Sequence, residues 1–264
     1  MAASDIPPEQ APGEAVAPGE RTITFDVGGT GLKATVLDAA GTQLAERVRV
    51  RTPYPCPPER LVATLLEVAE KLPAFDRVSV GLPGVIRGGR VLHTPHFITE
   101  SGPFTRIRPD LHEAWRDYDA ANEFHKAFAC PVRVVNDAEL AAIGVVSGVG
   151  FEVFLAFGTG LGAALFVDGR LLPKLELSAA PFRRGETFDE QLSDRARRAV
   201  GNVTWTRRVE RALARWHAVL WWDKLYVGGG NAKHFVGELG VEHTRVPNEA
   251  GILGGAKLWA YPLD

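Results

Sequence analysis

Residues 25–33 read FDVGGTGLK, an apolar run that carries Asp26 at its end and passes into a glycine-rich turn. The pattern predicts a buried strand over 22–27, a tight turn and a second strand over 33–38. Because glycine has no Cβ, the backbone N–H groups of such a turn can crowd around an anion. The segment is therefore built like a phosphate cradle, and its candidate binding residues are Gly28, Gly29, Thr30 and Lys33.

A second turn of the same type occurs at residues 157–162, which read FGTGLG between expected strands at 152–157 and 161–168. A triple glycine at 228–230 follows a further expected strand at 224–227. One glycine-rich hairpin alone is usually only a tight turn. Two such turns in matching settings, with a third glycine cluster, favour a nucleotide or phosphate held between two lobes. The candidate binding residues of the second turn are Gly158, Thr159 and Gly160.

Residues 134–142, VVNDAELAA, predict a strand that runs directly into a helix. Asn136 or Asp137 can cap this helix, and capping alone is one interpretation of the pair. Ligands also bind at the carboxyl ends of strands in α/β sheets, so both roles can coexist. The helix N-terminus is expected to keep Asp137 ionised, which makes it a weak base. Phosphoryl transfer tolerates a weak base, because its loose transition state depends mainly on positioning and charge neutralisation.

Two cycles of strand, glycine turn, strand and helix indicate an α/β protein with two lobes. The expected lobes are residues 21–134 and 135–247, and a helix at 248–260 is expected to complete the first. Residues 1–20, rich in Ala, Pro and Glu, are expected to form a disordered, solvated tail. The other expected elements are strands at 43–49, 77–81 and 132–135, helices opening at 57–58 and covering 120–128 and 204–222, and a loop-rich stretch at 83–109.

Composition excludes several classes of function. The 30 basic and 32 acidic side chains give a net charge of −2, without the positive field that nucleic-acid binding requires. No run approaches the roughly 18 apolar residues of a membrane-spanning helix, so no membrane association is expected. Cys56 and Cys130 lie far apart and lack the spacing of a zinc or redox site, so a reducing cytoplasm is the expected location.

Five short motifs follow one another along the chain: DVGGT at 26–30, GLPG at 81–84, NDA at 136–138, GTGLG at 158–162 and GGG at 228–230. In this order they resemble the motifs of ROK-family sugar kinases, and the resemblance covers residues 22–259. The polyphosphate glucokinase-like branch is the most similar, judged by LEL at 175–177, GGNAK at 229–233 and NEAG at 248–251.

The resemblance implies a two-lobed actin-like ATPase fold, also called ribonuclease H-like, with the active site in the interlobe cleft. It implies a homodimeric glucokinase that transfers a phosphoryl group from polyphosphate, ATP or both to the 6-hydroxyl of glucose or a similar hexose such as mannose. Asp137 is the implied base, and Asp26 the implied Mg²⁺ ligand, directly or through water. Donor phosphates would lie on the two glycine turns, and adenine near Gly229 and Asn231. The implied sugar contacts are Asn136, Gly84 and Glu176.

One departure from the wider family concerns zinc. Most members carry a zinc segment rich in Cys and His after the sugar-binding Glu, whereas residues 178–192 contain neither Cys nor His. No zinc is therefore expected. The segment TFDE at 187–190 resembles the zinc-free branch, in which either Asp189 or Glu190 is the second sugar carboxylate.

A second departure concerns the sugar pocket. The family pattern Glu-x-Gly-His reads ELSA at 176–179, so Ala179 stands where the family has a histidine that contacts the sugar. The alternative function is therefore a catalytically weakened or inactive sugar-binding or regulatory protein. The family's repressors carry a DNA-binding segment before the kinase-like part, and only about twenty residues precede Thr22, which disfavours transcriptional regulation.

Arg207, Arg211 and Arg215 recur every fourth residue along the expected long helix. A solvated helix face is one interpretation, because Val209 and Leu213 supply an opposite apolar stripe. A track for polyphosphate is the other interpretation, since repeated phosphates favour clustered guanidinium groups.

Overall fold

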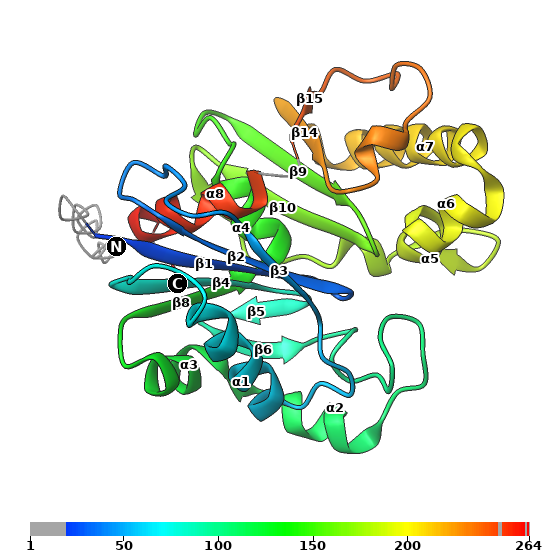
Figure 1. Ribbon diagram of the computed structural model, residues 1–264. Helices are drawn as coiled ribbons and strands as arrows, with labels where there is room; N and C mark the ends of the chain where they lie inside the picture. Colours follow the sequence, from blue (N-terminus) through cyan, green and yellow to red (C-terminus); the bar gives the residue numbers. More distant parts are fainter. Residues whose placement is uncertain (1–19, 248–249, 262, 264) are drawn as a thin grey trace, which may run out of the picture.

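The computed structural model describes residues 20–247, 250–261 and 263, and it contains two five-stranded mixed sheets (Figure 1). Residues 1–19 of the expected tail lie outside the described residues. The first sheet has the order β3-β2-β1-β4-β8. Its strands are β1 Thr22–Val27, β2 Gly31–Leu37, β3 Val48–Arg51, β4 Arg77–Leu82 and β8 Val132–Asn136.

The second sheet repeats the pattern of the first. Its order is β11-β10-β9-β14-β15, and its strands are β9 Phe151–Phe157, β10 Leu161–Val167, β11 Arg170–Leu171, β14 Lys224–Gly228 and β15 Thr244–Arg245. In both sheets the first three strands form an antiparallel meander, and parallel strands extend the other side. The repeated cycle expected from the glycine turns is confirmed.

Helices cover the outer face of each sheet. α1 Pro58–Ala69 and α3 Ala120–Phe128 pack on the first sheet, whereas α5 Phe188–Leu192 and α7 Asn202–Leu220 pack on the second (Figure 1). α1 begins at Pro58 because proline suits the first helical turn, where a backbone N–H has no partner. Its apolar residues recur at helical spacing and enter the core.

Two further helices lie between the sheets, as Figure 1 shows: α4 Asp137–Ile143 and α8 Ala250–Lys257. α8 packs on α4, β1 and β2. Gly254 allows this approach, because a Cβ there would come within 1.7 Å of the Leu140 carbonyl oxygen. Apolar residues of α4 form one core cluster with Val135 of the first sheet, with residues of β9, β10 and β14 of the second sheet and with Leu258, which places α4 between the sheets.

The division into lobes at 21–134 and 135–247, with the helix at 248–260 added to the first, remains a proposal. β8 extends the first sheet to Asn136, just beyond that boundary. Residues 248 and 249 of the expected helix lie outside the described residues, and the described part continues from α8 into the 3-10 helix η3 Leu258–Ala260.

Two expectations about local structure are wrong. The third strand of the first sheet is β3, not residues 43–49, because the polar segment before Val48 forms only an isolated bridge between Gln43 and Leu37. The stretch expected to be loop-rich contains a small sheet that a later strand completes: β5 Val85–Arg87, β6 Arg90–His93 and β7 Tyr118–Asp119.

Shorter elements complete the described chain. They are α2 Pro109–Trp115, α6 Asp194–Val200, β12 Pro181–Arg183, β13 Glu186–Thr187 and the 3-10 helices η1 Leu177–Ala179 and η2 Ala232–His234. Among the described residues, no helix has the length and apolar character needed to cross a bilayer.

Candidate active site

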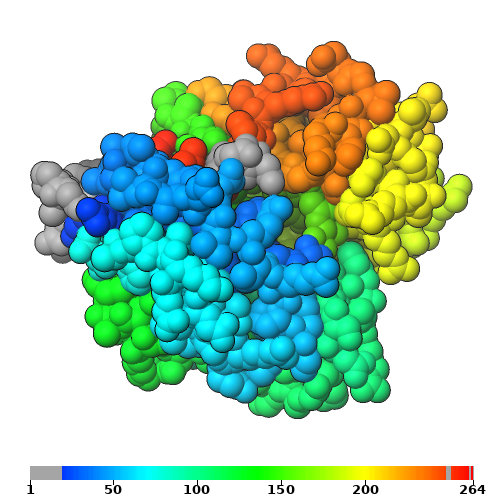
Figure 2. Space-filling model, viewed as in Figure 1, coloured from blue at the N-terminus to red at the C-terminus, as the bar shows by residue number. Residues whose placement is uncertain are grey.

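A cleft of about 540 Å³ separates the two sheets, and Figure 2 shows the molecule hollowed between the blue N-terminal part and the orange and yellow parts. Most residues expected at the site line this cleft. They are Asp26, Gly28, Gly29, Lys33, Gly84, Asn136, Asp137, Gly158, Thr159, Gly160, Glu176, Asp189 and Gly229. Within the described chain, Thr30 and Asn231 are the two expected residues that do not line it.

The two glycine turns face each other across the cleft. In the first, Gly28 N donates to Gly31 O at 2.9 Å, and in the second Gly158 N donates to Gly160 O at 2.9 Å. The hydroxyl oxygens of Thr30 and Thr159 lie 3.5 Å apart, so the tips of the turns almost touch. The arrangement is suited to an anion held from both sides.

Asn231 supports the second turn rather than facing the cleft. Its Nδ2 donates to Gly158 O at 3.0 Å, and its backbone N–H donates to Phe157 O at 2.9 Å. Gly229 packs against the same backbone with φ +84°, and a Cβ there would lie 2.4 Å from Phe157 O. Asn231 thus holds the second glycine turn, and the expectation that adenine binds near Gly229 and Asn231 stays a prediction.

Asp26 and Lys33 form a cross-strand pair. They are partners in the antiparallel register of β1 and β2, and Lys33 Nζ lies 2.8 Å from Asp26 Oδ2. Both side chains are 20% exposed, and both residues line the cleft. Lys33 is thus held beside the first glycine turn by an acidic partner.

Asn136, not Asp137, caps helix α4. Its Oδ1 accepts from Ala138 N at 3.0 Å and Glu139 N at 3.3 Å, and Glu139 Oε2 accepts from Asn136 N at 3.0 Å. This reciprocal capping box satisfies the first N–H groups of the helix. Asp137 is consequently the first helical residue, with its carboxylate directed into the cleft.

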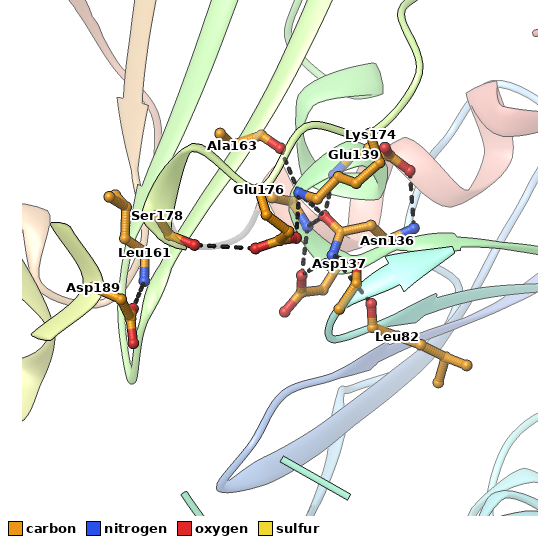
Figure 3. Close-up of polar contacts among 12 residues, drawn as sticks. Leu82, Asn136, Asp137, Glu139, Leu161, Ala163, Lys174, Glu176, Ser178 and Asp189 are labelled. Atoms are coloured by element: carbon orange, nitrogen blue, oxygen red, sulfur yellow. Dashed lines mark hydrogen bonds and ion pairs between the residues drawn. The ribbon is translucent and has the colours of Figure 1, made fainter. Parts of the chain in front are cut away.

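Asn136 also connects the helix to two other parts of the site. Its Nδ2 donates to Gly84 O at 2.9 Å. The same nitrogen donates to Asp137 Oδ1, also at 2.9 Å (Figure 3). Asp137 Oδ1 accepts a further bond from Ala138 N at 2.8 Å. The carboxylate therefore has one oxygen fixed by these bonds, and no described residue forms a hydrogen bond with the other.

The pKa of Asp137 is raised to about 7, first because its carboxyl is withdrawn from water and then because the Asp26 carboxylate lies nearby. The Lys174 ammonium and the Ala138 N–H lower it, but to a smaller extent than burial raises it. The expectation that the helix N-terminus keeps Asp137 ionised, and so a weak base, is therefore wrong. A carboxylate with this pKa is matched to proton acceptance near neutral pH.

Lys174 is a cleft residue that sequence reasoning missed. Its side chain is 3% exposed, and Nζ donates to Asn136 Oδ1 at 2.9 Å and Ala163 O at 2.6 Å. Glu176 Oε1 lies 3.9 Å from the same nitrogen. One signal was present in the sequence: residues 171–177, LLPKLEL, contain a single lysine in a mostly apolar run. A lysine buried in this way needs partners.

Asp189 and Glu190 differ in what they contact. Glu190 Oε2 accepts from the backbone N and Oγ1 of Thr187, which forms the capping box of α5 and lowers the pKa of Glu190. Asp189 Oδ1 accepts from Leu161 N at 2.8 Å beside the second glycine turn, and burial raises the pKa of Asp189. Both residues line the cleft and each has one carboxylate oxygen held by the protein, but Asp189 is the more buried of the two and lies beside the second glycine turn.

Glu176 and Ala179 lie on the wall of the cleft near Ser178, whose Oγ donates to Glu176 Oε2 at 3.0 Å (Figure 3). The expected departure from the family pattern therefore borders the cleft. Ser178 satisfies one oxygen of Glu176, and the other faces Lys174.

The ROK family model matches residues 22–173, more than half of the sequence. The chain belongs to the ROK family. It is 26% identical over 253 residues to a polyphosphate glucokinase of Mycobacterium tuberculosis, a match that covers 88% of each protein. The resemblance inferred from the five ROK motifs is confirmed.

Two solved kinase structures match most of the chain. An inorganic polyphosphate/ATP-glucomannokinase from Arthrobacter sp. strain KM superimposes with a TM-score of 0.76 at 27% identity, covering 92% of this chain and 98% of that one. A ROK glucokinase from Streptomyces griseus superimposes with a TM-score of 0.69 at 20% identity, covering 90% and 98%. The two-lobed actin-like ATPase fold predicted from the sequence is confirmed, and the relatives support a sugar kinase function.

Proposed function

We propose that this ROK protein is a hexose kinase that transfers a phosphoryl group from ATP or polyphosphate to the 6-hydroxyl of glucose or a similar hexose. The observation that carries the proposal is Asp137, a carboxylic acid with a pKa of about 7 on the wall of the cleft that the two facing glycine turns also line. The named activities of the polyphosphate glucokinase and glucomannokinase relatives support the same reaction class.

In this proposal the chain supplies position and charge. The N–H groups of both glycine turns hold the donor phosphates, and Asp137 orients the sugar hydroxyl and accepts its proton late in the transfer. Asn136, Gly84, Glu176 and Asp189 are the proposed sugar contacts. Because the transition state is loose, the reaction needs these groups in line more than it needs a strong base.

The carboxylates of the cleft are suited to Mg²⁺. This ion uses one or two carboxylates together with phosphate oxygens and water, rather than a cage made only of protein. Asp26 faces the cleft and lies close enough to Asp137 to raise its pKa, so an added cation would relieve the repulsion between the two carboxylates. Asp26 would hold Mg²⁺, directly or through water, and the bound ion would neutralise donor phosphate charge.

A panel of glucose, mannose and fructose, each with ATP or polyphosphate, tests the proposed substrates. We expect hexose phosphate to form with glucose or mannose and at least one donor in a coupled assay. Absence of product with every pair would contradict the proposal and favour a sugar-binding or regulatory protein.

The arginine stripe of α7 does not support a polyphosphate track. Arg215 Nη1 donates to Phe182 O at 2.5 Å, and its guanidinium lies 5.0 Å from the Phe182 ring. Among the residues that the structure describes, Arg207 and Arg211 are exposed and do not line the cleft. The solvated helix face is the better interpretation.

The activity should depend on pH through Asp137. Only the ionised carboxylate accepts a proton, so kcat/KM for the sugar is expected to rise with pH through about 7 and then level off. The pH profile of the residual activity of Asp137→Asn should not show this rise. A wild-type profile that is flat from about pH 5 to 8 would contradict the role of this carboxylate.

The same shift predicts the direction of a stability change. The pKa of Asp137 rises from 3.8 to about 7 on folding, so between these values the folded protein retains a proton that the unfolded chain has released. The contribution of Asp137 to the free energy of unfolding is therefore fully present below pH 3.8 and is lost as pH rises through about 7. Urea unfolding at both ends of the window checks this, with Asp137→Asn expected to lack this contribution.

The weakened-kinase alternative rests on Ala179. An imidazole at this position could donate to a sugar hydroxyl, so Ala179→His should strengthen glucose binding by up to about 3 kcal/mol, alone or with Ser178→Gly. Calorimetry and turnover measure the effect. Ala180→His is the matched control, because among the described residues Ala179 lines the cleft and Ala180 does not.

The outcomes separate three possibilities. A gain in both affinity and turnover supports a weakened kinase, whereas a gain in affinity without turnover in any variant supports the non-catalytic alternative. Tight wild-type binding that Ala179→His damages would show that the pocket holds the sugar differently from the proposed contacts.

A further inference from the structure

We propose that Lys174 is a positioning residue for phosphoryl transfer, which holds Asp137 in register with Glu176 by fixing the side chain of Asn136. The inference rests on the proposed kinase function. It concerns a residue that does not itself have to contact the donor or the reacting hydroxyl.

Lys174 bridges the two sheets at the cleft. Its Nζ donates to Asn136 Oδ1 at the end of β8, 2.9 Å away, and to Ala163 O in β10, 2.6 Å away. Lys174 comes from the segment between β11 and η1, and Figure 3 marks its bonds to Asn136 and Ala163. Its side chain is 3% exposed, so these protein partners replace most of the contact that the ammonium would have with bulk water. The cross-link therefore relates the first sheet to the second at the candidate active site.

The bond to Asn136 continues to the proposed base. An ammonium can only donate, so Lys174 binds the amide oxygen of Asn136, the same atom that the Ala138 and Glu139 N–H groups bind, and the amide nitrogen faces away. That nitrogen donates to Asp137 Oδ1 at 2.9 Å and to Gly84 O at 2.9 Å. A displacement of Lys174 would thus reach Asp137 through a single side chain.

Helix capping does not require Lys174. Asn136 Oδ1 already accepts from Ala138 N and Glu139 N, and Glu139 returns a bond to Asn136 N. α4 therefore keeps its capping box without the lysine. The capping box does not set how far Asn136 lies from β10. The bond from Lys174 does, because the same ammonium also donates to Ala163 O in β10.

The Lys174 ammonium also lies near Glu176. Two of its three donors are used by Asn136 and Ala163, and Glu176 Oε1 lies 3.9 Å away. The positive charge also lies close enough to act on the carboxylates of Asp137 and Glu139. Lys174 is thus the cation that keeps three neighbouring acidic groups together, and a neutral side chain would leave them to repel one another.

The test compares Lys174→Met with Lys174→Arg, and uses Lys224→Met as the control. Lys224 is an exposed lysine at the start of β14 in the second sheet, and it donates to Ser147 Oγ. Lys174→Met should lower kcat about thirtyfold, the scale expected for a slightly misplaced catalytic group, with the sugar KM changed less than about threefold. Lys174→Arg should retain more activity, and Lys224→Met should match the wild type.

A double-mutant cycle distinguishes positioning from general damage. If Lys174 acts through Asp137, adding Lys174→Met to Asp137→Asn should lower kcat no further. Losses that multiply, a kcat within about threefold of wild type, or a rise in KM alone would each overturn the proposal. Thermal unfolding monitors integrity, and Lys174→Gln, which keeps an amide donor, replaces the methionine variant in the cycle if that variant does not fold.

The wild-type protein separates this inference from the proposed function. An active wild type with an unaffected Lys174→Met variant would overturn only the role of Lys174. A wild type without sugar phosphorylation would overturn the kinase proposal and this inference with it.

Discussion

Asp137→Asn is expected to lower kcat by at least about a hundredfold while sugar affinity stays within about tenfold. The amide has nearly the shape of the carboxylate and can still accept from Ala138 N, which lies 2.8 Å from Asp137 Oδ1. It cannot take up the proton of a sugar hydroxyl. Steady-state turnover and calorimetric sugar binding measure the two effects separately.

Asp168→Asn is the matched control. Asp168 is an exposed aspartate in the turn after β10, where its Oδ1 accepts from Gly150 N at 2.9 Å. Asparagine tolerates the left-handed backbone at this position, so the variant should fold and retain full turnover. Comparable turnover of Asp137→Asn and Asp168→Asn would remove Asp137 from the mechanism.

Gly84→Ala is expected to reduce the free energy of unfolding by about 3 kcal/mol. Gly84 has φ +113°, and a Cβ there would lie 2.1 Å from the carbonyl oxygen of His93. The backbone of β5 or β6 would have to move, and Gly84 O would leave the Nδ2 of Asn136. Denaturant unfolding measures the stability loss, and reduced turnover should accompany it.

Gly41→Ala separates the two causes of that loss. Gly41 has φ +83°, but among the described residues no atom lies within 4 Å of the position of an added Cβ. Only backbone strain applies there, so the expected loss is about 1 kcal/mol. Equal losses in the two variants would mean that the His93 contact contributes nothing.

Periodicity predicted the long elements well. β1 at Thr22–Val27 and α3 at Ala120–Phe128 have the expected bounds, because each is a continuous apolar or amphipathic run with clear breakers. The glycine turns were found because glycine-rich segments between two strands form tight turns. The Asn136–Asp137 pair was found because Asn and Asp are typical helix-capping residues. Local chemistry was therefore sufficient for these parts of the fold and site.

Features that depend on distant partners were not predicted. β5 and β6 have three and four residues, too few to show alternation, and β6 pairs with a strand contributed from beyond α2. Lys174 is held by Asn136 and Ala163, which lie elsewhere in the chain. The pKa of Asp137 depends on burial and on Asp26, neither of which its local sequence reveals.

One ambiguity could have been reduced from the sequence. Thr187 and Glu190 have the spacing of a capping box, which predicts that Glu190 turns back toward Thr187. The structure contains that capping box, and Asp189 instead contacts the second glycine turn through Leu161 N. The bond between Asn231 and Gly158 offered no comparable local signal.

The most direct measurement is phosphorus NMR of the product formed from glucose, Mg²⁺ and either ATP or polyphosphate. The account predicts glucose 6-phosphate with at least one donor for the wild type and for Asp168→Asn, and at least about a hundredfold slower formation for Asp137→Asn. Phosphorylation at another hydroxyl, no sugar phosphate from any wild-type reaction, or undiminished formation by Asp137→Asn would contradict it.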